Sequence, residues 1–294
     1  MFDAQQLILT AVVGLGVGFL SGVFGAGGGF LIVPILNIAL RVPVQFAVGA
    51  ASCQILGPAT TSLLARRLAW RELKLPLIVA GGQIVGAFLG AAALEQARQL
   101  GNGDAATVGS RSPDSAELVV MVLYLAILLL IGLFTILESR RGRTREDGGG
   151  WLTAFRVPPL CDLPEFNGRP VSIPLLSWFG LAIGFFSGLL GIGGAFLLLP
   201  GMIYLWGMRT HAAIRASLVM IWIGAIPNTI AHAWHGNIDL GLVSALLVGG
   251  TVGARIGSEV GQRWAGPKLR RRFGWVLLAT AGMIAYRLAE MLLN

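Results

Sequence analysis

The chain has 294 residues, of which 55% are hydrophobic and 12% charged, and its mean hydropathy is +0.76. Because the apolar residues come in long runs, this composition excludes a soluble globular domain and predicts an all-α polytopic membrane protein in a lipid bilayer. The net charge of +8 does not indicate nucleic-acid binding, since Arg and Lys gather in short clusters between the apolar runs, as loop charges do.

The first apolar run predicts a transmembrane helix over about residues 5–24. Small residues recur in it at four-residue steps, at Gly14, Gly18 and Gly22. This spacing lets a second helix approach the backbone closely. No Lys or Arg precedes the run, so we expect it not to be a cleaved signal peptide.

A cluster of glycines follows this helix: Gly25, Gly27, Gly28 and Gly29. Holding them in a continuous helix would cost roughly 1 kcal/mol for each, because glycine loses the most backbone freedom. We therefore predict a break, followed by a shorter helix over about 28–40 that contains Pro34. Non-helical backbone at membrane depth survives only where protein or a water-filled cavity shelters it, so the break should line a cavity.

Apolar runs predict the remaining helices in two groups. The first lies at about 43–66, 73–97 and 116–138, and the second at about 173–190, then after more glycines to about 207, and at 210–233, 239–263 and 268–291. Residues 101–115 have turn composition and predict a solvated loop. We expect an N-terminal membrane repeat (1–138), a cytoplasmic linker (139–172) and a C-terminal membrane repeat (173–294).

The glycine segment is written twice in the chain. Residues 18–34 return without a gap as residues 184–200, so that Phe pairs with Phe, Ser with Ser and Pro with Pro. The second group of glycines is Gly191, Gly193 and Gly194, with Ala195 at the position of Gly29. The two halves therefore descend from one unit.

Basic clusters between the apolar runs predict how the halves are oriented. Three clusters should be cytoplasmic: Arg66, Arg67, Arg71 and Lys74; Arg140, Arg141, Arg143 and Arg145; and Arg263, Lys268, Arg270, Arg271 and Arg272. They all face inward only if the two pieces around each glycine break return to their starting side. This predicts two inverted repeats, each starting with a glycine-broken helix hairpin, with both termini outside.

These residues resemble a known family. The doubled Gly-x-x-Ser-Gly-x-x-Gly-x-Gly-Gly-(Gly/Ala)-Phe-Leu-x-x-Pro motif, the Ala-Ser pairs at 51–52 and 216–217 and the Gly-Ala-x-x-Gly helices resemble the TauE/SafE-type sulfite exporter family of integral membrane permeases. The resemblance covers nearly all of the chain outside residues 98–115 and 139–172. It implies bacterial export of sulfite or of small organosulfonates such as sulfoacetate, and it assigns no binding residues beyond the glycine breaks.

The glycine breaks are the first candidates for substrate binding. A break exposes backbone N–H groups at the start of the next helix, where the helix dipole favours negative charge. Two such starts from related halves could converge on one small oxyanion. The alternative is that these glycines serve only close helix packing.

Two arginines inside predicted helices are further candidates, Arg215 and Arg255. An Arg at membrane depth costs roughly 2.5–3.5 kcal/mol on insertion scales, so it normally has a partner or a role. The alternatives are that Arg255 pairs with Glu259 and that Arg215 extends to the interface. No Asp or Glu lies near the middle of a predicted helix, which favours an anionic substrate over a cation.

Polar side chains in the predicted helices complete the candidate site: Ser52, Gln54, Gln83, Ser217 and Asn228, with Ser21 and Ser187 inside the doubled motif. Their hydroxyl and amide donors suit a sulfonate or sulfite, although interhelical hydrogen bonds explain each of them equally well. His232 and His235 lack an apparent third ligand, so we expect no metal and no cofactor, and a role as proton acceptors stays open.

The sequence thus predicts a secondary transporter of the inner membrane, and not an enzyme, that moves a small sulfur-containing anion outward. We expect the site at the midplane between the breaks and alternating access by rocking of one half against the other. The alternative is a proton-coupled permease for another small organic acid. A homodimer is left open.

Overall fold

Long apolar helices dominate the computed structural model, which describes residues 4–24, 28–66, 73–104, 115–140, 150–155, 157–166, 168–263 and 266–293. Among these residues, six helices are long and apolar enough to cross a membrane: α1 (Ala4–Phe24), α5 (Lys74–Asp104), α6 (Ser115–Arg140), α7 (Ile173–Leu190), α9 (Thr210–Trp234) and α10 (Leu240–Gln262). A seventh long helix, α11 (Gly266–Leu293), packs along α6. The predicted polytopic helical architecture is confirmed.

Shorter helices lie between the long ones: α2 (Gly29–Leu40), α3 (Val44–Gln54), α4 (Leu56–Arg66) and α8 (Ala195–Pro200). The single helix predicted over 43–66 is wrong, because α3 and α4 are separated by a turn at Ile55. Pro58 has no N–H to donate to the carbonyl of Gln54, which interrupts the helical hydrogen bonds at this point. The helix predicted to about 207 also changes character, since a π-helical turn, Gly201–Leu205, follows α8.

Two other segments differ from the sequence prediction. Helix α5 continues to Asp104, so the first residues of the predicted 101–115 loop are helical, while 105–114 lie outside the described residues. The predicted linker contains two short antiparallel strands, β1 (Leu160–Asp162) and β2 (Pro170–Ser172), and two 3-10 turns, Leu152–Ala154 and Pro164–Phe166. Three-residue strands leave too short a pattern to detect from the sequence.

Helices α1 and α10 lie in backbone contact and run parallel. A Cβ atom at Gly14 would come within 2.7 Å of the Leu246 carbonyl oxygen, and one at Gly18 would meet the backbone of Gly250. In return, a Cβ at Gly253 would meet the Leu15 carbonyl. The contacts advance in the same direction along both chains. The close approach predicted from the glycine spacing of the first helix is confirmed.

Helices α5 and α7 form a second parallel pair of the same kind. Cβ atoms at Gly82, Gly86 and Gly90 would meet the backbone of Ser177, Leu181 and Phe185 in turn. Each pair joins one helix from each half of the chain. In the repeat, α1 corresponds to α7 and α5 corresponds to α10, so the two pairs are equivalent.

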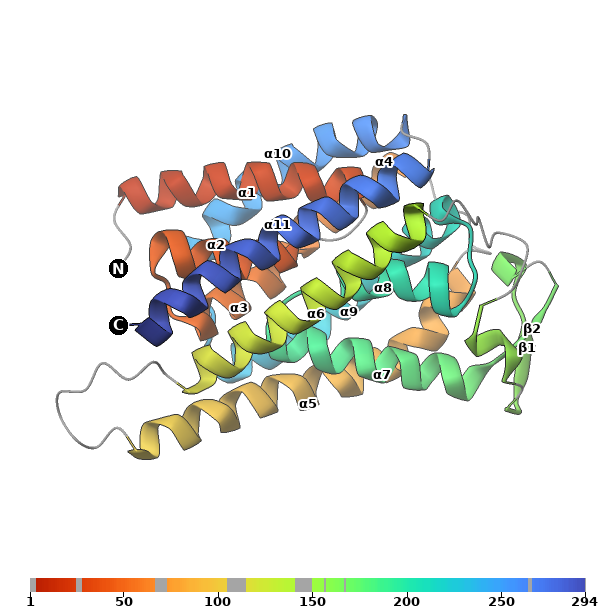
Figure 1. The fold of residues 1–294 in the computed structure, drawn as a ribbon, viewed down its shortest axis with the longest axis horizontal. Coiled ribbons are helices and arrows are strands. Elements are labelled where there is room, and N and C mark those ends of the chain that lie inside the picture. Colours follow the sequence, from red (N-terminus) through yellow and green to blue (C-terminus); the bar gives the residue numbers. More distant parts are fainter. Residues whose placement is uncertain are drawn as a thin grey trace.

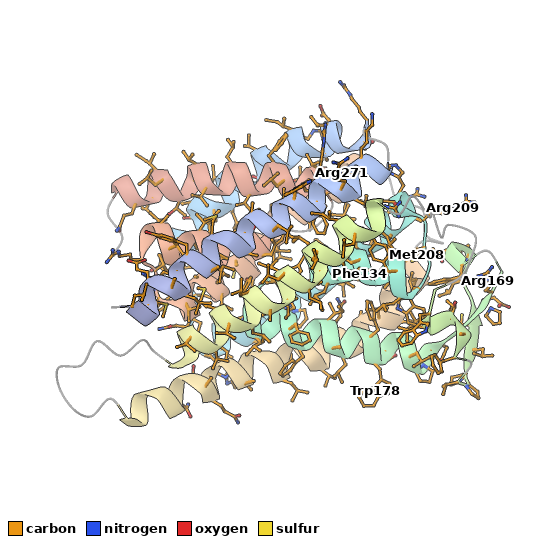
Figure 2. The ribbon with its side chains drawn as sticks, viewed as in Figure 1. Phe134, Arg169, Trp178, Met208, Arg209 and Arg271 are labelled. Atoms are coloured by element: carbon orange, nitrogen blue, oxygen red, sulfur yellow. The ribbon has the colours of Figure 1, made fainter. Side chains whose placement is uncertain are left out.

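Figure 1 shows how the helices run relative to one another. Both termini lie at one end of the bundle, and the strands β1 and β2 lie at the other end. Helix α1 runs from the end with the termini toward the strands, whereas α7 runs in the opposite direction; α6 and α11 are opposed in the same way. Arg169 and Arg209 lie at the end with the strands (Figure 2).

Candidate functional site: the junction of two glycine breaks

The second glycine break has the backbone that the sequence predicts. Helix α7 ends at Leu190, and Gly191, Gly193 and Gly194 have φ angles of +67°, +63° and +69° before α8 begins at Ala195. Glycine adopts this left-handed region without the steric cost that a Cβ atom imposes. The break at this position is confirmed.

The first break is described at its C-terminal side. Gly28 has a φ of +72° directly before α2, and Gly29 is the first residue of that helix. Gly25 and Gly27 lie outside the described residues. Gly28 is the repeat equivalent of Gly194, and both residues precede a helix with the same backbone conformation.

The two breaks contact each other directly. A Cβ atom at Gly29 would lie 2.8 Å from the carbonyl oxygen of Gly191 and 3.0 Å from the carbonyl carbon of Ile192. The rings of Phe30 and Phe196, equivalent residues of the doubled motif, meet with their centroids 5.7 Å apart. The starts of α2 and α8 are therefore adjacent.

Two buried side chains that the sequence pattern does not distinguish from other core residues contact this junction. The Ile55 side chain approaches both breaks, with its Cδ1 atom 2.9 Å from a Cβ placed on Gly29 and in contact with one placed on Gly193. The Tyr124 hydroxyl donates a 2.8 Å hydrogen bond to the Leu190 carbonyl at the end of α7. No sequence signal identified Tyr124, since a lone tyrosine in an apolar helix suggests only core packing.

A buried polar cluster lies where α5, α7 and α9 meet. The Asn228 Nδ2 donates to Ser187 Oγ at 2.7 Å and to the Gly224 carbonyl at 2.9 Å. The amide group of Gln83 lies 3.5 Å from a Cβ placed on Gly224. All of these side chains are buried. The structure thus brings together two predicted site residues, Gln83 and Asn228, with Ser187.

His232 extends this cluster by one helical turn. It follows Asn228 at the i+4 position on α9, so the two side chains share a face of the helix. Its Nε2 lies 2.9 Å from the Gly188 carbonyl, next to Ser187 on α7. We call Gln83, Ser187, Asn228 and His232 the α9 cluster.

Gln54 occupies a related position on the other side of the molecule. It is fully buried, and both of its amide atoms have no hydrogen-bond partner among the described residues. Its Nε2 lies against Gly250. Because Gly86 corresponds to Gly253 in the repeat, Gly250 corresponds to Gln83. On one side of the molecule Gln54 of α3 lies against Gly250 of α10, and on the other Gln83 of α5 lies near Gly224 of α9. The equivalent position is therefore glycine on α10 and glutamine on α5.

The serines of the Ala-Ser pairs donate to their own helices. Ser52 Oγ donates to the Val48 carbonyl at 2.9 Å, and Ser217 Oγ donates to the Ile214 carbonyl at 3.0 Å. Both residues are buried. They must give up these bonds before they can donate to a substrate.

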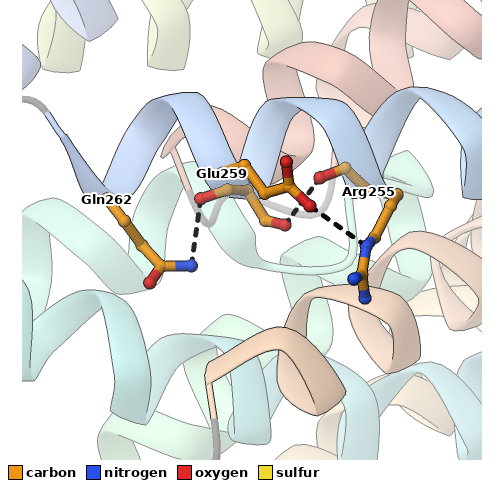
Figure 3. A network of polar contacts seen from close by, with 4 residues as sticks. Arg255, Glu259 and Gln262 are labelled. Carbon is orange, nitrogen blue, oxygen red and sulfur yellow. Dashed lines mark hydrogen bonds and ion pairs between the residues drawn. The ribbon is translucent and has the colours of Figure 1, made fainter.

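The two candidate arginines do not lie at the junction of the breaks. Arg215 is on an exposed face of α9, and the Arg255 side chain is 62% exposed on α10. Arg255 Nε lies 3.3 Å from Glu259 Oε1, which is the pairing that the sequence left open (Figure 3). Ser258 and Gln262 extend this network through hydrogen bonds to backbone carbonyls of α10.

Comparisons with known proteins agree on a membrane transporter. The model of the family described as Sulfite exporter TauE/SafE matches residues 9–284. A probable membrane transporter protein of Xylella fastidiosa (strain 9a5c) is 27% identical over 290 residues, which cover 96% of each chain. The Bacillus subtilis protein YunE, also named a probable membrane transporter protein, is 24% identical over 88% of this chain and 90% of its own. No solved structure matches.

Proposed function

Because this chain belongs to the Sulfite exporter TauE/SafE family, we propose that it exports a small sulfur-containing anion, sulfite or an organosulfonate such as sulfoacetate, across the bacterial inner membrane. Family membership and the relatives make it a multi-pass membrane transporter and not an enzyme. We propose in addition the identity of the transported anion, the location in the inner membrane and the outward direction of transport.

The meeting of the two breaks carries this proposal. Gly29 lies against the Gly191 carbonyl, so α2 and α8 begin next to each other. The first N–H groups of a helix have no partner within the helix and favour negative charge. The anion binds at this junction, which Gly28 and Gly29 border on one side and Gly191, Gly193 and Gly194 on the other.

Polar side chains flank the proposed anion position. Gln54 and the α9 cluster lie on the helices around the breaks, and Ser52 and Ser217 lie on α3 and α9 near them. Arg215 and Arg255 lie outside this region, and we assign them to attraction of the anion toward the protein, since exposed cations raise the local anion concentration.

The arrangement of the helices supports inverted repeats. Equivalent helices run in opposite directions in Figure 1, as α1 and α7 do, and the α1–α10 pair has its counterpart in the α5–α7 pair.

These helix pairs also indicate which parts of the protein move as rigid bodies during transport. Rocking of one sequence half against the other would separate α1 from α10 and α5 from α7, whose backbones are in contact along several turns. Alternating access therefore moves the α1–α10 pair against the α5–α7 pair.

The membrane potential supplies a driving force for export. With a negative interior, each unit of negative charge that leaves the cell gains about 2.3 kcal/mol per 100 mV. An anion can then leave by uniport, without a coupling ion.

A ligand screen tests the substrate class. The purified protein is melted in the presence of sulfite, sulfate, sulfoacetate, taurine, thiosulfate, acetate and chloride, because a ligand that binds only the folded state raises the melting temperature. We expect selective stabilisation by a sulfur oxyanion. Stabilisation by a neutral or cationic solute alone would contradict an anion site.

The surroundings of His232 favour a second candidate function, that of a proton-coupled permease for another small organic acid. Its imidazole is fully buried and its Nδ1 has no partner among the described residues, so it offers a place for a proton in transit. The two candidates differ in one measurement: an imposed pH gradient changes the initial flux of a proton-coupled permease and leaves that of an anion uniporter unchanged.

A further inference from the structure

We propose that the α9 cluster binds a hydrogen-bond donor of the transported anion, so that the protein selects sulfur anions that carry an O–H or N–H group over anions that carry only acceptors. This inference rests on the proposed function and narrows it: among small sulfur-containing anions, it favours those with a hydroxyl or amino group over sulfite and sulfoacetate, which carry only acceptors. Several buried polar atoms of the cluster have no partner among the described residues.

The orientation of the Asn228 amide is fixed by its neighbours. The Gly224 carbonyl can only accept a hydrogen bond, so the atom that faces it at 2.9 Å must be the NH₂ group. The Oδ1 atom then points elsewhere, and it is buried without a partner among the described residues. Asn228 therefore presents an unused acceptor.

His232 presents an acceptor for a similar reason, and Gln83 adds the oxygen of its amide group. The Gly188 carbonyl can only accept, so the Nε2 atom of His232 carries a hydrogen, and in the neutral ring Nδ1 is an acceptor. Nδ1 and the Oε1 atom of Gln83 are both buried without a partner in the described part of the chain. Three acceptors without a partner in the described part of the chain thus lie on α5 and α9 where these helices meet α7, and Ser187 on α7 offers one hydroxyl hydrogen.

The same helices supply no positive charge near the cluster. Helix α7 has no charged residue, and the described charged residues of α5 and α9 that are closest in sequence are Lys74, nine positions from Gln83, and Arg215, thirteen positions from Asn228. At about 3.6 residues per turn they lie more than two and more than three turns away, and both are exposed. A bare oxyanion in this place would face acceptors without a cation. A hydroxyl or ammonium group of the substrate would instead satisfy groups that are costly to leave unpaired.

Gln54 provides the contrast within the same molecule. Both its donor and its acceptor atoms are unpaired, so it can receive either kind of group. Its surroundings therefore do not select for a donor, whereas those of the α9 cluster do.

The test compares two ligands that differ by one hydroxyl group. Binding of ethanesulfonate and of 2-hydroxyethanesulfonate to the full-length protein is measured by calorimetry, with sulfite as a reference. We expect the hydroxylated ligand to bind at least about tenfold more tightly, which corresponds to about 1.4 kcal/mol. Equal affinities of the two ligands would overturn the inference and leave the proposed function intact. If no sulfur anion binds, both fail.

A pair of variants locates the effect. Gln83→Met removes the unpaired acceptor with little change in volume, and Gln54→Met does the same at the other glutamine. We expect Gln83→Met to reduce the preference for the hydroxylated ligand and Gln54→Met to retain it. The opposite pattern would overturn the assignment to the α9 cluster. The ligand comparison on the unmodified protein decides the inference even if a variant does not fold.

Discussion

Phe30 and Phe196 occupy the same position in the two halves of the chain, and their rings meet at 5.7 Å between centroids with an interplanar angle of 60°. In the proposed inverted repeat, two equivalent residues contact each other only near the axis that relates the halves. The doubled motif therefore marks the centre of the molecule, where the two glycine breaks meet. A substrate bound there would contact related surfaces of both halves.

The contact between the breaks predicts the effect of a single methyl group at Gly29. Gly29→Ala places a Cβ 2.8 Å from the Gly191 carbonyl and 2.9 Å from Ile55 Cδ1, so the breaks must move apart. We expect a loss of about 1–3 kcal/mol in stability, as for other overpacked sites, and at least a tenfold loss of transport. Gly16→Ala is the control, because a Cβ there meets no atom within 4 Å. Normal transport by Gly29→Ala would contradict the importance of this contact.

The parallel pair of α5 and α7 predicts a second contrast between neighbouring glycines. A Cβ at Gly86 would meet the backbone of Leu181 and Phe185, whereas a Cβ at Gly81 meets no atom within 4 Å. Gly86→Ala should lower the melting temperature clearly. Gly81→Ala should be neutral or stabilising, since alanine favours a helix over glycine by about 1 kcal/mol. Similar melting curves for the two variants would show that the helices are not in backbone contact.

We expect removal of the Tyr124 hydrogen bond to lower the stability of the protein modestly. Tyr124→Phe leaves the buried Leu190 carbonyl at the end of α7 without its donor, at a cost of about 1–3 kcal/mol. Tyr286→Phe is a suitable control, because Tyr286 is exposed on α11. Unfolding in detergent with increasing denaturant measures both. Equal midpoints would mean that the Tyr124 bond does not hold the break.

Arg255 tests the role proposed for the exposed arginines. The pair with Glu259 is exposed, so Arg255→Ala should change stability by no more than about 1 kcal/mol. If Arg255 attracts the anion, the same variant should lower anion affinity about tenfold, which is about 1.4 kcal/mol. Glu259→Gln keeps the cation and should retain affinity. An unchanged affinity in a folded Arg255→Ala protein would reduce Arg255 to a partner of Glu259.

Most of this architecture could be predicted from the sequence, because a membrane-spanning helix requires a long apolar run that is easily recognised. Long apolar runs located the six spanning helices, and the spacing of Gly14, Gly18 and Gly22 indicated a close helix contact. The second break follows from Gly191, Gly193 and Gly194, which adopt a left-handed backbone that residues with a Cβ atom avoid.

Contacts between distant segments could not be predicted in the same way. Nothing in the local pattern shows that α1 packs on α10, that Ile55 lies between the breaks, or that Arg255 is on an exposed face. These depend on how the helices assemble. The division of 43–66 at Ile55 can be read from Pro58, which has no N–H to donate to the Gln54 carbonyl.

Transport by the reconstituted protein tests the central claim most directly. Vesicles with an imposed inside-negative potential are loaded with sulfite, and efflux is compared for the unmodified protein, Gly29→Ala and Gly16→Ala. We expect the potential to accelerate efflux through the unmodified protein and Gly16→Ala, and little efflux through Gly29→Ala. Efflux no faster than from protein-free vesicles, for sulfite and for organosulfonates alike, would contradict the export of a sulfur anion through the junction of the two breaks.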